Sequence, residues 1–126
     1  MSQLNVTLRS TATEQRYQTD IAAGKTRPLE IMPSIKQWEH WRLVENDYPY
    51  DAFFKTHHML VIKRGGVAER TDLNDTERAE LEQILKQFVY PGYHFWFENC
   101  PRRRTAPGIY HLHLIVYKDR RDEVLL

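Results

Sequence analysis

Two histidines separated by one residue, His111 and His113, have the residue types and spacing best suited to chemistry in this sequence. In an extended strand, residues two positions apart point to the same face, so the two imidazole rings are expected side by side. Paired imidazoles serve in metal ligation, in acid–base or nucleophilic catalysis, or in plain packing. The spacing alone leaves these three uses open.

Other chemistries have weaker support in the residues. A zinc site needs three or four protein ligands, and the single cysteine, Cys100, lies beyond an arginine-rich segment, although His57, His58 and His94 offer further imidazoles. We find no nucleophile-elbow motif and no phosphate-binding glycine motif. Histidine chemistry on an anion is therefore the leading hypothesis, and a metal-binding or purely structural domain remains an alternative.

The composition indicates one ordinary globular domain. The chain has 126 residues, of which 41% are hydrophobic and 28% are charged. A net charge of +1 gives no overall field for duplex nucleic acid or an anionic membrane, so neither is expected as a partner. The single cysteine favours a reducing compartment, and we see no signal-peptide pattern or long apolar run, so we expect a cytoplasmic location.

Four segments carry the patterns of strands. The segment from Ile109 to Tyr117 alternates, with an apolar face and a face that carries the histidine pair. Residues 38–46 are rich in aromatic and branched side chains, and residues 57–62 form a continuous apolar run typical of a central strand. Residues 93–98 alternate again, so these four strands would form the sheet that positions the histidines.

One helix is expected from about Asp75 to Val89. Asn74 is a suitable N-cap and Glu77 lies three residues later, as in a capping box. Pro91 and Gly92 are expected to end the helix. The apolar residues spaced to form its buried face are Leu81, Ile84, Leu85 and Phe88.

The first 33 residues differ from the rest of the chain. They are polar and largely aperiodic, apart from a possible short helix around Tyr17 and Ile21. We therefore divide the chain into an N-terminal extension, residues 1–33, and one main domain, residues 34–126.

The text Gly-Ile-Tyr-His-Leu-His-Leu-Ile-Val, which begins at Gly108, resembles the signature of the histidine triad (HIT) superfamily. In that family an asparagine shortly precedes the strand, as Asn99 does here. An Asn or Asp also stands three residues before a proline, as Asn46 does before Pro49. The similarity covers about residues 38 to 118 in the family's order.

The resemblance implies an α+β fold in which one main helix packs across an antiparallel sheet, and a two-fold homodimer. It implies a metal-independent nucleotide phosphohydrolase or nucleotidyl transferase, with no cofactor, acting at the α-phosphate of a purine nucleotide or nucleotide conjugate. Phosphoramidates and dinucleoside polyphosphates are the expected substrates. The resemblance implies that His113 is the nucleophile and that His111 orients and polarises the site.

The same resemblance suggests the residues that bind substrate. Asn46 maps to a ribose hydroxyl contact, and Asn99 with the backbone near Gly108 maps to phosphate oxygens. His58, which begins an apolar strand followed by Lys63 and Arg64, maps to a second histidine element of the pocket.

The third histidine of the family pattern is replaced by Ile115. Loss of one hydrogen-bond donor around a phosphate typically costs about 10² to 10³ in rate. Arg104, in a run of three arginines that precedes the strand, is a candidate to compensate by binding phosphate. The alternative hypothesis is therefore a catalytically weak or inactive nucleotide-binding module.

Overall fold

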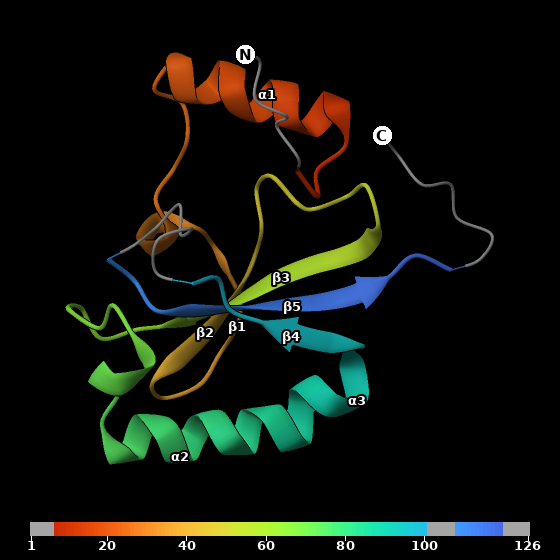
Figure 1. Ribbon diagram of the computed structural model, residues 1–126. Helices are drawn as coiled ribbons and strands as arrows, with labels where there is room; N and C mark the ends of the chain where they lie inside the picture. Colours follow the sequence, from red (N-terminus) through yellow and green to blue (C-terminus); the bar gives the residue numbers. More distant parts are fainter. Residues whose placement is uncertain (1–6, 101–107, 120–126) are drawn as a thin grey trace.

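The protein is described by a computed structural model that covers residues 7–100 and 108–119. Its centre is a five-stranded antiparallel sheet in the order β1-β2-β3-β5-β4 (Figure 1). The strands are β1 (Ser34–Gln37), β2 (Trp41–Glu45), β3 (Phe54–Ile62), β4 (Phe95–Phe97) and β5 (His111–Tyr117). Helices pack against this sheet, so the expected α+β fold is confirmed.

The four expected strands are all present, with shorter or shifted ends, and the run at residues 57–62 is central, as expected. The pattern missed β1, a short strand at one edge of the sheet, because most of its side chains are exposed and it has no buried face to impose an alternating pattern. β1 forms the edge of the sheet that is farthest from the histidine pair. The pair lies on β5, between β3 and the other edge strand, β4.

Helix α2 (Asp75–Ile84) begins as the sequence predicts. The Asn74 side chain accepts from the Glu77 backbone N–H at 2.9 Å, and the Glu77 carboxylate accepts from the Asn74 N–H at 2.8 Å. The helical stretch then continues through a π-helical turn, Leu85–Val89, into α3 (Tyr90–Gly92). Pro91 therefore lies inside the last turn, at the start of α3, and the helical stretch ends at Gly92.

The face of the sheet that meets α2 is the main core. Trp41 is fully buried there and donates its indole N–H to the Glu77 carbonyl at 3.0 Å. The residues of β5 on this face, and the expected apolar face of α2, meet in one cluster that includes Leu60, Leu81, Ile84, Leu85, Tyr110, Leu112 and Leu114. None of the helices in the described ranges is long and apolar enough to cross a membrane.

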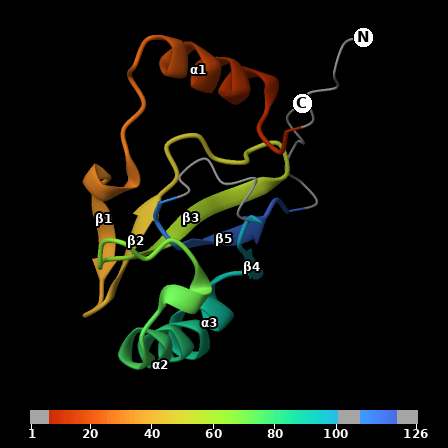
Figure 2. The same ribbon diagram turned by 60° about the vertical axis from the view of Figure 1, so that its left-hand side comes forward.

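The opposite face of the sheet is covered by the N-terminal segment and by the loop between β2 and β3 (Figure 2). The helix expected near Tyr17 is α1 (Thr11–Ala22). Asp51 of the loop accepts from the Ser10 backbone N–H at 2.8 Å and from the Thr13 hydroxyl at 2.7 Å. Tyr48 of the same loop donates to Asp20 at 2.7 Å. These hydrogen bonds, together with the packing of Tyr17 on the Tyr48 ring, hold α1 over this face.

Candidate functional site

A cavity of about 480 Å³ lies between the N-terminal segment and the sheet face that carries the histidines. Pockets of this size are typical of small-molecule and cofactor sites. Leu29 and Met59 line its apolar part and belong to a buried cluster that Val44 and Val61 complete. The residues that line the cavity and bear on its chemistry are Arg9, Arg27, Asn46, Tyr50, Gly108, His111 and His113.

The histidine pair lies where the alternating pattern of β5 placed it. His111 and His113 are 6% and 3% exposed, and both line the cavity. Their ring centres are 5.1 Å apart with an interplanar angle of 66°. Leu112, between them in sequence, is fully buried on the α2 side. Successive residues of β5 in this stretch therefore point alternately to the cavity and to the core on the α2 side.

A third imidazole joins this pair, and it is His57 rather than His58. Nε2 of His57 lies 2.7 Å from Nδ1 of His113. His58 pairs in register with Leu114, on the α2 side, where its Nδ1 lies 2.6 Å from the Tyr93 hydroxyl. The expectation for His58 is corrected accordingly: neighbouring residues of a strand point to opposite faces, and the register of β3 selects His57.

One backbone hydrogen bond to His57, followed by the contact between His57 and His113, fixes the proton positions on these two rings. The Tyr50 backbone N–H donates to Nδ1 of His57 at 3.0 Å, so that nitrogen carries no proton. Neutral His57 is then protonated at Nε2 and donates to Nδ1 of His113. Neutral His113 consequently carries its own proton at Nε2.

His111 has the opposite tautomer. Its Nδ1 lies 2.8 Å from the carbonyl oxygen of Ile109, and a carbonyl oxygen accepts only, so Nδ1 carries the proton. In the neutral ring the lone pair is then on Nε2. The pair on β5 therefore combines one imidazole with a nucleophilic Nε2 and one with an Nε2–H donor.

Burial keeps two of the three imidazoles neutral. It lowers the pKa of His57 to about 3, with the positive charge of Arg9 adding to the effect. Burial also lowers the pKa of His113 to about 2, followed by the influence of His57 and His111 and then Arg9. Both rings are therefore neutral at pH 7, as the tautomer assignment requires.

Aromatic rings hold the His113 imidazole in place. It stacks on Phe97 with ring centres 4.8 Å apart and planes 11° apart. Tyr50 lies 5.7 Å away at 18°. Phe97 pairs with His113 across β4 and β5, so the sheet register produces this stacking. The orientation of the Nε2–H is thus set by packing on the ring as well as by His57.

The other predicted site residues have mixed placements. Asn46 lines the cavity, with its amide Nδ2 3.3 Å from Nε2 of His57 and its Oδ1 accepting from the Tyr48 N–H. The Asn99 amide lies 3.5 Å from Nε2 of His113, and Gly108 is in the cavity wall. Arg104 lies outside the described residues.

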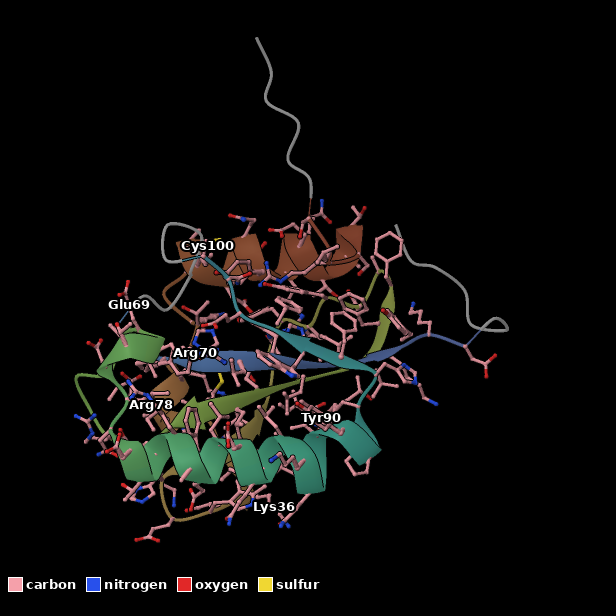
Figure 3. The ribbon with its side chains drawn as sticks, turned by 60° about the horizontal axis from the view of Figure 1, so that its bottom comes forward. Lys36, Glu69, Arg70, Arg78, Tyr90 and Cys100 are labelled. Carbon is pink, nitrogen blue, oxygen red and sulfur yellow. The ribbon has the colours of Figure 1, made fainter. Side chains whose placement is uncertain are left out.

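The segment that follows β4 explains how Asn99 reaches the histidines. Figure 3 shows Tyr90 on the α2 side of the sheet and Cys100 on the α1 side. The chain crosses the layer along β4, and this crossing brings Asn99 to the cavity face.

Ile115 offers no polar group to the cavity. It is fully buried and pairs with Phe95 on one side and His57 on the other. The imidazole absent from position 115 is therefore matched by one on the neighbouring strand, in register with it.

The sequence did not predict that Tyr50, Arg9 and Arg27 line the cavity. It also did not predict which of its other histidines contacts His113, which is His57. The alternation of His57 with Met59 on β3 was a usable signal, because both belong to the face opposite His58. No local pattern marks the arginines, since only long-range packing brings them to the sheet.

One group of three possible metal ligands occurs within residues 7–100 and 108–119, formed by Glu39, His40 and Glu80. It lies at the β1–β2 turn beside α2, where Glu80 accepts from the His40 backbone N–H at 2.7 Å. It is separate from the histidine cavity, and carboxylates there are engaged with the protein itself.

Comparisons with known proteins bear on the fold and the family. The structure is similar to a solved one titled "Crystal Structure of HTC1", with a TM-score of 0.52 and 17% sequence identity over 89% of this chain and 76% of that one. At that identity the likeness concerns the fold alone. No curated protein sequence matches the chain. A family model matches residues 3–117, nearly the whole described region, and the chain therefore belongs to the family described as "Protein of unknown function (DUF3605)".

Proposed function

We propose that this protein is a metal-independent nucleotide phosphohydrolase or nucleotidyl transferase that acts at the α-phosphate through a histidine nucleophile. One observation carries the proposal: His111 and His113, with complementary proton positions, lie side by side in the wall of a cavity of about 480 Å³. A nucleophile beside a hydrogen-bond donor is the minimum that phosphoryl transfer through a covalent intermediate requires. The HIT-like sequence pattern suggests the same chemistry.

The tautomers favour His111 as the nucleophile, in place of the His113 that the sequence resemblance suggests. Nε2 of His111 holds a lone pair because Nδ1 donates to Ile109. Nε2 of His113 holds a proton because Nδ1 accepts from His57. We assign His113 the role of a neutral donor to a non-bridging phosphate oxygen, where charge grows during attack.

The reaction balances without a metal. The Nε2 lone pair of His111 forms a bond to the α-phosphorus, and the bond from phosphorus to the leaving group breaks. An amine leaving group takes a proton from solvent. Water then attacks the nucleotidyl-histidine, the phosphorus–nitrogen bond breaks, His111 is regenerated, and one proton returns to solvent. In a transferase another hydroxyl or phosphate takes the place of this water.

The test is turnover of an adenosine phosphoramidate and of diadenosine polyphosphate with chelator present. We expect His111→Ala to abolish turnover and His113→Ala to lower it by about 10² to 10³, the usual cost of one donor. His58→Ala, which removes an imidazole from the α2 side, is the matched control and should retain turnover. An alkaline quench followed by mass mapping should find the nucleotidyl group on His111, and an adduct on His113 would overturn the assignment.

A second function is favoured by Ile115. Because this side chain is fully buried, no third donor reaches the cavity from β5. The protein would then be a nucleotide-binding module with slow or no turnover. If the protein bound nucleotide but turned over neither substrate, and His111→Ala bound nucleotide as tightly as wild type, the binding module would be favoured over the enzyme.

A further inference from the structure

Arg9 is a nearly buried cation on the wall of the histidine cavity. Its side chain is 11% exposed, and its guanidinium carbon lies 4.2 Å from the Tyr17 ring centre and 5.2 Å from that of Tyr50. Its Nε donates to the Tyr48 carbonyl at 2.8 Å. The group is thus clamped between α1 and the loop that also contacts His57.

The charge of Arg9 is only partly compensated. Its carboxylate contact is a single one, from Nη1 to Glu14 at 3.3 Å, and Glu14 also accepts from Gln18. By contrast, Arg27, the other described arginine of the cavity, forms two hydrogen bonds of 2.7 and 2.8 Å with Asp47. Among the described residues, none forms a hydrogen bond with Nη2 of Arg9.

The field of Arg9 also reaches the histidines. Its positive charge contributes to the low pKa of both His57 and His113. A cation that is desolvated beside neutral rings favours an anion in the same space, because burying charge without a partner is costly.

From this arrangement we propose that Arg9 binds the phosphate of the nucleotide and sets a requirement for a negatively charged ligand. The inference rests on the proposed nucleotide site and names the residue that selects its substrate class. With Nε and Nη1 held by the protein, Nη2 is the guanidinium nitrogen that remains to bind phosphate oxygens. The N-terminal segment would therefore be part of the binding site.

Arg16, on α1 just after the segment that holds Arg9, is a matched control. Its guanidinium carbon lies 4.6 Å from the Tyr48 ring centre, and its Nη2 donates to the Asp47 carbonyl at 2.8 Å. It fastens α1 to the same loop by the same kinds of contact, but it does not line the cavity. A purely structural role for these arginines would make both substitutions behave alike.

The experiment measures the affinity of AMP and of adenosine by calorimetry in wild type, Arg9→Ala and Arg16→Ala. We expect Arg9→Ala to weaken AMP binding by about 10- to 100-fold, the value of a charge-assisted hydrogen bond, while adenosine binding stays close to wild type. Arg16→Ala should keep the wild-type ratio of the two affinities. Equal losses for AMP and adenosine in Arg9→Ala, or no loss, would overturn the inference.

Arg9→Lys covers the case in which Arg9→Ala fails to fold. It keeps the charge and loses the fork, so AMP affinity should fall by less than in the alanine variant and adenosine affinity should not change. If AMP affinity in Arg9→Lys no longer fell as salt was added, a contact between this side chain and phosphate would be contradicted.

These measurements can refute the role of Arg9 and the proposed enzyme activity separately. AMP binding that depends on Arg9 in a protein with no turnover would keep the inference and reject the enzyme. Turnover that is unchanged in Arg9→Ala would keep the enzyme and reject the inference.

Discussion

Lowering the pH from 7 to 5 should destabilise this protein far more than its composition suggests. His57 and His113 are almost fully buried, and the pKa values of these histidines are lowered to about 3 and about 2. In the unfolded chain a histidine titrates near 6.5. Below that pH these histidines bind protons in the unfolded state but not in the folded state, so the free energy of unfolding falls as pH falls.

The magnitude follows from the two titrations. Between pH 7 and pH 5, each histidine that stays neutral in the fold but titrates normally when unfolded removes about 2 kcal/mol. Together they remove about 4 kcal/mol, a large part of the 5–15 kcal/mol that is usual for a domain. Most carboxylates remain ionised in this window, so the histidines dominate the change.

Urea titrations at pH 7, 6 and 5, followed through tryptophan fluorescence and circular dichroism, measure this quantity. His57→Gln and His113→Gln each remove one titrating group and should each reduce the loss to about 2 kcal/mol. Each variant is a control for the other, because the two imidazoles contact each other and each variant removes only one of them.

A loss below about 1 kcal/mol in wild type between pH 7 and 5 would refute the reasoning, because it would mean that the two imidazoles protonate in the folded protein at ordinary pH. The tautomer assignment on which the proposed mechanism depends would then fail as well. Nitrogen chemical shifts of the histidine rings at pH 7 give an independent check of the same assignment.

Two further predictions concern the core. Leu81→Asp should unfold the domain, since Leu81 is 4% exposed within the main cluster and a charge there has no partner, whereas Glu82→Asp on the exposed face of α2 should melt close to wild type. A melt of Leu81→Asp like that of wild type would show that the helix register is wrong. Glu77→Gln should cost about 1.5–3 kcal/mol in urea unfolding at pH 7, because the buried carboxylate accepts two hydrogen bonds from Arg64 and one from the Asn74 N–H, and an amide would turn a donor toward Arg64. An unchanged midpoint would argue against a stabilising ion pair between the buried Glu77 carboxylate and the half-exposed Arg64.

Local patterns predicted the elements whose buried faces repeat regularly. The alternation along β5 placed His111 and His113 opposite Leu112, and the capping box placed the start of α2 at Asn74. Both features depend on residues a few positions apart. They were therefore readable without knowledge of the neighbouring strands.

The parts that the sequence did not predict depend on pairing between distant segments. Whether His57 or His58 faces the cavity is set by the register of β3 against β5, and a shift of one residue exchanges them. The position of Arg9 depends on the packing of α1 over the β2–β3 loop. The continuation of the helix past Ile84 through a π-helical turn depends on tertiary packing rather than propensity.

The covering of the histidine face by α1 gives the cavity a late place in the order of folding. Arg9 leaves the ribosome well before the strand that carries His111 and His113. The two walls can meet only after the sheet between them has formed, and contacts between such distant segments form slowly. A nascent chain with α2 already folded would thus present an open, apolar sheet face until β5 pairs with β3, and only then would the N-terminal segment find the surface it closes.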